Sequence, residues 1–257
     1  KVQSLFSRQY QAPVLYENPA GGMFPMLPMA NRVAGNRFIF QGREIVLPRH
    51  HADAHFFLHG DGWLQCWDII ACGGDFCVLQ LRRQHVCGFD YLAQIRYQLL
   101  RNQLIASLTL THCGSTPIPY GCGFHPFFSF DKRSTVQFAA SGYWPEGEQH
   151  LPLNWQSPLP GYADFSHPQY GEERWLNVGY SGWSGRARIV SNVMNIAILS
   201  QTSWLMLFRM QGEPFLCLEP QTHPVNAHNM EGQPGLRVLG TGDTLNFSLK
   251  IDVQGRE

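Results

Sequence analysis

The sequence predicts an all-β fold, a large antiparallel β-sandwich, from three observations. Apolar and polar residues alternate with a period of two in many short segments. The 257 residues include 25 Gly and 17 Pro, which are spread along the chain as frequent turn signals. No window of a dozen residues has the period of an amphipathic helix. Sandwiches of this length commonly form one unit, and no linker or repeat divides the chain, so we predict a single domain over residues 1–257.

The predicted strands follow one another along the chain. Residues 38–40 and 45–47 form a hairpin around Gln41-Gly42, and residues 95–99 and 104–110 form another around the polar turn 101–103. Short strands are expected at 77–81, 196–199, 204–210 and 215–218. The strongest alternation comes last, with apolar side chains at Leu245, Phe247, Leu249, Ile251 and Val253. Residues 145–174 lack a period and predict a long loop over one end of the sheet, a kind of segment that is often functional.

Composition excludes several classes of protein. Hydrophobic residues make up 44% of the chain, which suits a thick core and not a disordered chain. The formal net charge is zero, so nucleic acid and anionic membranes are not expected as partners. No apolar run is long enough to span a membrane, and no signal peptide is apparent. The seven Cys residues include no CxxC pair, which favours reduced thiols, with Cys77, Cys87, Cys122 and Cys217 in the core, and a cytoplasmic location.

Four short segments each place one polar residue near a turn rich in Gly or Pro, where we expect strands to end. They contain Arg32, His59, His125 and Glu219. Taken singly, each has an ordinary structural interpretation: a His among aromatic residues usually packs, and Glu219 or Arg32 could face water. Strand ends on a rigid sheet are nevertheless good places to hold catalytic groups.

Metal and hydrolase chemistry fit the sequence less well. His51, His55 and His59 are spaced by four, which on a helix would align three imidazoles for zinc. Pro48 and the turn after His59 disfavour a helix there, so we predict no metal site. A GxSxG nucleophile elbow is absent, and Gly121-Cys122-Gly123 leads into His and Pro instead of a helix, so it is not a dinucleotide site.

Read in order, the four segments resemble the aldose 1-epimerase (galactose mutarotase) family. The resemblance covers roughly residues 24–253 and rests on segments at 31–38, 58–63, 121–128 and 219–222: Asn-Arg before a Gly and a Phe, His-Gly with a following Gly-Trp, Gly-Phe-His-Pro-Phe, and Glu-Pro-Gln-Thr. It implies the same β-sandwich that the period of two predicts. It also implies sugar chemistry that uses neither a cofactor nor a metal.

The resemblance implies a role for each site residue. Glu219 would be the general base that takes the proton of the anomeric hydroxyl, and His125 the general acid that protonates the ring oxygen. The open aldehyde would rotate and close as the other anomer. Substrate-binding residues would be Arg32, His59, Asn177, Asn31 and Trp63. The aromatic rings of Trp63, Phe127 and Trp183 could stack on the sugar.

One position departs from the family's pattern, and two other functions stay open. Asn177 stands where the family usually has an Asp that binds sugar hydroxyls, so the sugar preference or the activity could differ. A hexose-6-phosphate 1-epimerase would need a basic cluster, for which only Arg82-Arg83 and the pair Arg186 and Arg188 are available. A non-catalytic sugar-binding or regulatory protein is the other alternative. We expect a small-molecule sugar as ligand and a monomer or homodimer.

Overall fold

The computed structural model describes residues 1–170 and 174–256, and strands dominate this part of the chain. The helical elements among these residues are four short 3₁₀ turns: Ala34–Asn36, Gly62–Leu64, Glu148–His150 and Ala227–Asn229. The predicted all-β fold is therefore confirmed. Among the described residues, no helix has the length and apolarity needed to cross a membrane.

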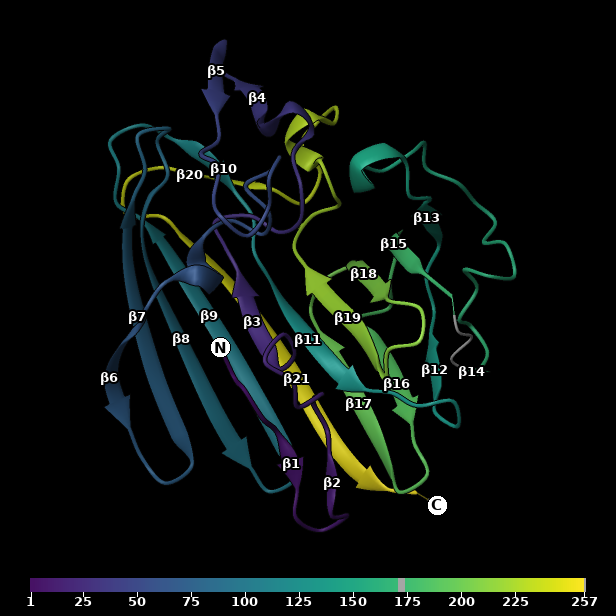
Figure 1. The fold of residues 1–257 in the computed structure, drawn as a ribbon. Helices are drawn as coiled ribbons and strands as arrows, with labels where there is room; N and C mark the ends of the chain where they lie inside the picture. The colour runs from purple at the N-terminus through teal and green to yellow at the C-terminus, as the bar shows by residue number, and fades with distance from the viewer. Residues whose placement is uncertain (171–173, 257) are drawn as a thin grey trace.

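Two large antiparallel sheets build the fold (Figure 1). The nine-stranded sheet has the order β14 (Gln169–Tyr170), β12 (Thr135–Phe138), β16 (Arg186–Val190), β17 (Met194–Ser200), β21 (Thr244–Gly255), β9 (Gln103–His112), β8 (Asp90–Leu100), β7 (Phe76–Gln84) and β6 (Asp68–Cys72). The six-stranded sheet has the order β13 (Gly142–Trp144), β15 (Leu176–Ser181), β18 (Trp204–Arg209), β19 (Phe215–Gln221), β11 (Gly123–Ser129) and β3 (Met23–Met26). Three small pairs complete it: β1 (Phe6–Ser7) with β2 (Ala12–Pro13), β4 (Arg37–Phe40) with β5 (Arg43–Val46), and β10 (Ile118–Tyr120) with β20 (Arg237–Leu239).

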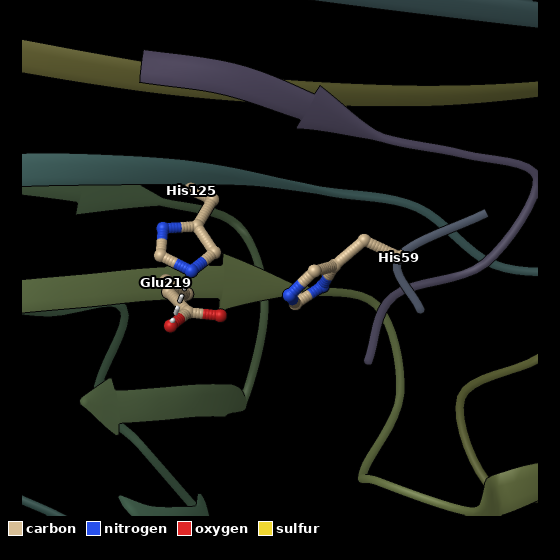
Figure 2. A group of neighbouring side chains, drawn as sticks. All are labelled: His59, His125 and Glu219. Carbon is tan, nitrogen blue, oxygen red and sulfur yellow. Dashed lines mark ion pairs between the residues drawn. The ribbon is translucent and has the colours of Figure 1, made fainter. Parts of the chain in front are cut away.

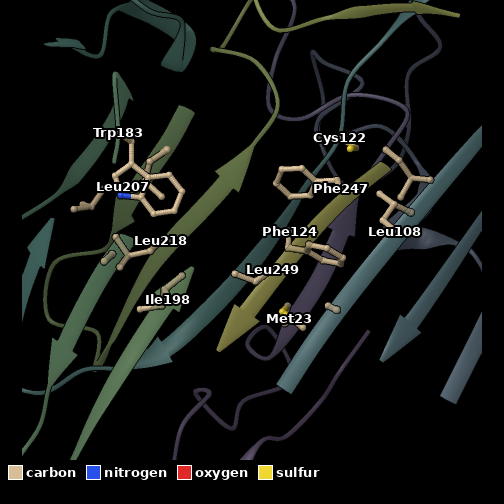
Figure 3. Packing of buried hydrophobic residues seen from close by; sticks show 14 of the residues in the cluster. Met23, Leu108, Cys122, Phe124, Trp183, Ile198, Leu207, Leu218, Phe247 and Leu249 are labelled. Carbon is tan, nitrogen blue, oxygen red and sulfur yellow. The ribbon is translucent and has the colours of Figure 1, made fainter. Parts of the chain in front are cut away.

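The main hydrophobic core lies between the two large sheets (Figure 3). Phe124 of β11 and Phe247 of β21 face each other with ring centroids 6.0 Å apart. Leu218 of β19 and Ile198 of β17 are fully buried in the same cluster. Burial in β21 alternates as predicted, because each apolar side chain turns to the core and each polar one away from it.

Most predicted strands are confirmed, but two site residues lie differently from the prediction. Both predicted hairpins form, as β4–β5 and as β8–β9. We predicted that Glu219 ends its strand and that His125 lies where a strand gives way to a turn. Instead β19 continues to Gln221, and His125 lies within β11. Pro220 does not end the strand, because a proline can remain in a strand where no ladder bond needs its missing N–H.

The cysteine prediction holds in part. All seven thiols are free. Cys122 and Cys217 are buried as expected, whereas Cys77 and Cys87 are only half-buried and therefore do not belong to the core interior.

Candidate active site

A cleft of about 600 Å³ opens beside the six-stranded sheet, within the usual size range of small-molecule sites. Its walls carry several aromatic side chains, among them Phe24, Trp175 and Phe208. The residues that the sequence predicts for the site all line this one cleft: Asn31, Arg32, His59, Trp63, His125, Asn177 and Glu219.

Glu219 and His125 form the centre of the cleft. Their strands are neighbours, and the paired positions Gly123–Gln221 and Phe127–Cys217 flank them, so the antiparallel register places the two residues opposite each other. The His125 Nε2 atom lies 3.1 Å from the Glu219 Oε1 atom (Figure 2). Both residues are almost completely buried, at 5% and 1% exposure. A carboxyl and an imidazole therefore lie in close contact on a rigid sheet.

Aromatic packing fixes the imidazole of His125. Phe24 stacks on one side with centroids 4.6 Å apart, and Phe127 stacks at 4.7 Å with nearly parallel planes. The Phe24 ring in turn stacks on Trp63, whose indole N–H donates to the Leu58 and Gly60 carbonyls. This arrangement leaves His125 little freedom to turn away from Glu219.

Burial shifts both pKa values in the direction that removes charge. Desolvation raises the pKa of Glu219 to about 8, although the Arg32 guanidinium opposes the rise. Desolvation lowers the pKa of His125 to about 3, while a backbone hydrogen bond opposes this change and Arg32 adds to it. At neutral pH the pair is therefore mainly a neutral imidazole beside a carboxylic acid. One exchangeable proton is thus shared between the Glu219 carboxyl and the His125 Nε2 atom.

His59 faces this pair from the loop after residue 58 (Figure 2). Its ring lies edge-on to His125 with centroids 5.1 Å apart. The Asn31 backbone N–H donates to the His59 Nδ1 atom at 3.1 Å, and the backbone N–H of His59 donates to the Asn31 carbonyl at 2.9 Å. Burial and the nearby His125 and Arg32 charges lower the pKa of His59 well below its ordinary value. The ring is thus neutral with its proton on Nε2, which makes it a hydrogen-bond donor.

The same tautomer argues against a metal site. Among the described residues, the group of possible ligand atoms that lie within 4.8 Å of one another comes from His59, His125 and Glu219, and it includes neither His51 nor His55. Histidines that bind metals donate their second ring nitrogen to an acceptor, which leaves the first with a free lone pair. The His59 Nδ1 atom instead accepts a backbone proton, so its Nε2 carries a hydrogen. The group fits proton transfer better than metal coordination.

Gly60 lets the His59 loop lie close to β3. Its φ is +66°, and a Cβ atom at this position would lie 2.1 Å from the Leu27 carbonyl oxygen.

We expect Gly60→Ala to lower the free energy of unfolding by more than Gly42→Ala does. Gly42 also has a positive φ, +76°, but has no atom within 4 Å of the added Cβ. Both variants incur the left-handed cost of about 1–2 kcal/mol, and only Gly60→Ala adds a clash with backbone. Urea denaturation of the two variants measures the difference; equal losses would contradict the close-packing argument.

Arg32 supplies the permanent positive charge nearest the pair. It lines the cleft, and its Nη1 donates to the Asn31 side-chain oxygen at 3.3 Å. Burial lowers the Arg32 pKa, while Asp53, Glu219 and Glu146 raise it. A guanidinium remains charged under such a shift, so Arg32 can bind a hydroxyl or stabilise negative charge in the cleft.

The opposite wall was only partly predicted. Asn177 was predicted, but Trp175, His150 and Glu146 were not. Glu146 and His150 lie within the long loop 145–174 that we expected to be functional, and Trp175 directly follows it. Glu146 accepts hydrogen bonds from Asn177 Nδ2 at 2.6 Å, from Trp175 Nε1 at 2.6 Å and from His150 Nδ1 at 2.5 Å. One carboxylate therefore joins three residues that line the cleft.

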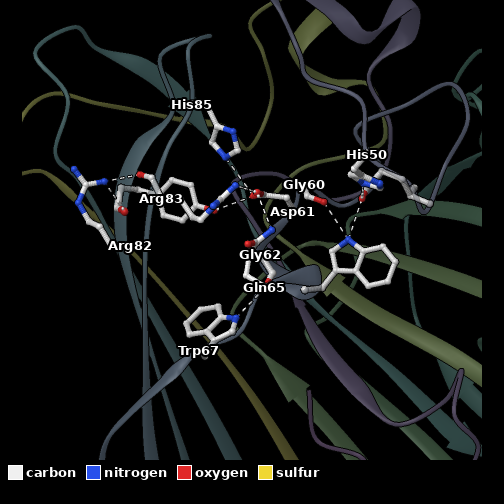
Figure 4. Close-up of polar contacts among 12 residues, drawn as sticks. His50, Gly60, Asp61, Gly62, Gln65, Trp67, Arg82, Arg83 and His85 are labelled. Atoms are coloured by element: carbon white, nitrogen blue, oxygen red, sulfur yellow. Dashed lines mark hydrogen bonds and ion pairs between the residues drawn. The ribbon is translucent and has the colours of Figure 1, made fainter.

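A largely buried ion network is centred on Asp61, two residues after His59 in the same loop (Figure 4). Asp61 is 4% exposed. Its carboxylate accepts hydrogen bonds from Arg83 at 2.5 Å, from His85 at 3.2 Å and from Tyr91 at 3.4 Å. Burial opposes ionisation of Asp61, yet His85 and Arg83 hold its pKa below the ordinary value. The network ties the loop to β7 and β8.

The two predicted basic pairs lie outside the cleft. Arg83 and Arg82 pair with Asp61 and Asp90, and Arg186 and Arg188 line a separate cavity. Neither basic pair is therefore placed to hold a phosphate on a sugar in this cleft.

The expectation that Trp183 stacks on the sugar is wrong. Trp183 is 3% exposed and belongs to the main core, where its indole N–H donates to the Arg186 carbonyl (Figure 3).

Comparison with known proteins identifies the class that this fold and site define. The sequence pattern of the aldose 1-epimerase family matches residues 8–252, and the chain belongs to that family. An uncharacterized protein of Escherichia coli K12, YphB, is 34% identical over 244 residues, which cover 90% of this chain and 83% of YphB. A second uncharacterized protein from the same organism, YihR, is 20% identical over 228 residues, which cover 79% of this chain and 70% of YihR.

Solved structures share the fold. A crystal structure of a candidate aldose 1-epimerase from E. coli K12 superposes with a TM-score of 0.90 at 32% identity and covers 95% of this chain and 90% of its own. An aldose epimerase homologue from C. elegans gives a TM-score of 0.80 at 16% identity, with coverage of 99% and 92%. At that identity the likeness concerns the fold alone.

Proposed function

We propose that the protein is an aldose 1-epimerase that interconverts the α and β anomers of a free hexose or related sugar. The observation that carries the proposal is the 3.1 Å contact between His125 Nε2 and Glu219 Oε1 at the centre of an aromatic cleft. Ring opening of a hemiacetal needs one proton removed from the anomeric hydroxyl and one delivered to the ring oxygen. Two groups that share a single proton and touch the same small volume meet that requirement.

The proton balance works in both directions. For ring opening, the pair acts as a carboxylate and an imidazolium: Glu219 takes the anomeric proton and His125 gives one to the ring oxygen. The pair is then a carboxylic acid and a neutral imidazole, which is its favoured state without sugar. That state catalyses the reverse step, in which His125 accepts the proton of the attacking hydroxyl and Glu219 protonates the aldehyde oxygen. The pair holds one proton before each step and one after it, so no further acid or base is needed.

The remaining cleft residues bind and orient the sugar. His59 presents an Nε2–H donor beside the pair, and Arg32 presents a charged donor. Both can bind oxygens whose negative charge grows as the ring opens or closes. The half-buried indole of Trp63, which lines the cleft, offers an apolar surface to the C–H face of a pyranose.

The pH dependence follows from the two pKa values. Glu219, with a pKa of about 8, loses the shared proton above that pH, and His125, with a pKa of about 3, gains a second proton below that pH. We expect kcat/KM to be flat between these limits and to fall tenfold per pH unit beyond each of them. Polarimetry across this range, with the spontaneous rate subtracted, measures the profile. An alkaline limb that remains after Glu219→Gln would contradict the assignment.

A panel of sugars tests the proposal itself. Fresh α-D-glucose, α-D-galactose and their 6-phosphates are followed by polarimetry with and without the protein. We expect acceleration of at least one free sugar and no preference for the phosphates, because neither basic pair lines the cleft. Binding of sugars without acceleration of any would overturn the proposal in favour of a non-catalytic sugar-binding protein.

A further inference from the structure

Glu146 occupies an unusual place behind the cleft wall. It lies just after β13, and its side chain retains only 22% exposure. Its Oε1 atom accepts from both Asn177 and His150, and its Oε2 atom accepts from Trp175. Burial favours the neutral acid, yet these hydrogen bonds keep the pKa of Glu146 below its ordinary value. Glu146 is therefore an anion with three donors, all of which belong to residues that line the cleft.

The contact with Glu146 fixes which half of the Asn177 amide a ligand meets. A carboxylate accepts hydrogen bonds and cannot donate them, so the amide must turn its NH₂ group to Glu146. The Asn177 Oδ1 atom makes no hydrogen bond to the residues that the structure describes, and Asn177 lines the cleft. The group left for a ligand is thus a carbonyl oxygen, which accepts a proton from a sugar hydroxyl.

We propose that Glu146 is a positioning residue for substrate selection: it holds Asn177 as a hydrogen-bond acceptor for one hydroxyl of the aldose. This inference rests on the proposed function for the identity of the ligand. If Glu146 orients the Asn177 amide, and does not only hold its loop in place, the residue type at position 177 must matter. An Asp at position 177 would also present an acceptor, but it would face Glu146 with a second carboxylate instead of an NH₂ group.

The test uses Asn177→Asp, Glu146→Gln and the double variant, with the free sugar that the wild type converts fastest. In Asn177→Asp the two carboxyl groups can stay in contact only if they share a proton. We expect KM to rise about tenfold at pH 8, roughly the value of one hydrogen bond. It should return toward the wild-type value at pH 5, where the proton is available. The kcat should change little, because Glu219 and His125 are untouched.

The other two variants test whether KM depends on the hydrogen-bonding character of the side chain at position 146 or only on its packing. Glu146→Gln can donate to the Asn177 oxygen and turn the amide around, so KM should also rise about tenfold, without the pH dependence. In the double variant the NH₂ group of the introduced Gln can donate to the introduced Asp carboxylate, which again leaves an oxygen for the sugar. We therefore expect its KM within about threefold of wild type at both pH values. Urea denaturation shows whether each variant is folded.

Two outcomes overturn the inference. One is a KM for Asn177→Asp that matches wild type at pH 8; the other is a double variant whose KM rises by the product of the single effects. If the wild type accelerates no sugar, the proposed function fails separately. The Kd of D-galactose and D-glucose, measured by ligand-observed NMR titration, then replaces KM in the same comparison. Absence of binding to either sugar, or a Kd unchanged in all three variants, would overturn the inference as well.

Discussion

Replacing Glu219 with Gln is expected to slow anomer interconversion by at least about 100-fold, with kcat affected more than KM. Gln keeps the shape and the polar character of the side chain but cannot take or release the shared proton at any accessible pH. His125→Asn should have an effect of the same size, because the His125 imidazole at 3.1 Å from Glu219 is the other half of the proton exchange. Polarimetry on the best sugar measures both.

Two further measurements show whether a slower rate comes from lost proton transfer or from lost folding. Glu219 is a buried acid whose pKa of about 8 lies above its ordinary 4.5, so the folded state keeps a proton that the unfolded state releases between these values. Below about pH 6.5 the buried histidines act in the opposite direction, because their lowered pKa values make stability rise with pH. The Glu219 contribution should therefore appear as a fall in wild-type stability from about pH 6.5 to about 8, and Glu219→Gln should not show this decline. The variant is then no less stable than wild type at pH 8. Near-wild-type activity in Glu219→Gln or His125→Asn would refute the assigned roles, and the double variant should be no worse than the weaker single variant.

Removal of the Asp61 carboxylate should give the largest loss of stability. Asp61→Ala leaves Arg83 and His85 without their shared acceptor in a largely buried position. Breaking a buried ion network in this way costs about 3–5 kcal/mol, and the 30% exposure of the Arg83 side chain places the expected value near the lower end. Urea denaturation at pH 7 measures the change.

Glu44→Ala is the matched control. Its pair with Arg37 is more than half exposed on both sides, so its loss should cost at most about 1 kcal/mol. Asp61→Ala should also raise KM, because the Asp61 network anchors the loop that carries His59 two residues earlier. A loss of stability no larger than that of Glu44→Ala would show that the Asp61 network does not hold the loop.

Local patterns in the sequence predicted the strands well but their ends less well. The β8–β9 hairpin and β21 follow from alternation alone, because a strand with one buried face repeats its environment every two residues. The predicted end of β19 was wrong, because Pro220 resembles a terminator and only the pairing with β18 and β11 extends the strand to Gln221. Pairing of distant segments is not encoded in any short window.

The site could be predicted only where its residues lie in recognisable segments. Glu219 and His125 were found because motif order revealed them, while their 3.1 Å contact depends on the register between two strands that are far apart in the sequence. Glu146 was missed, because a lone acid in a loop without a period carries no signal. Its importance comes from three hydrogen bonds that only the folded chain forms. The prediction that Trp183 stacks on the sugar was wrong for a different reason. A Trp next to a glycine turn gives no indication of which side of the sheet its ring occupies.

The alternation within β11 has a consequence for how this protein can change over time. Phe124 and Phe128 fill the core, while His125 and Phe127 line the cleft, so successive side chains serve folding and chemistry in turn. Point substitutions at the cleft positions can therefore abolish the proposed activity without changing the fold. An insertion or deletion of one residue in this strand would instead send phenylalanines to the cleft and the imidazole to the interior. Variants of this protein that lose the proposed activity should therefore differ by point substitutions, and their β11 should keep its length.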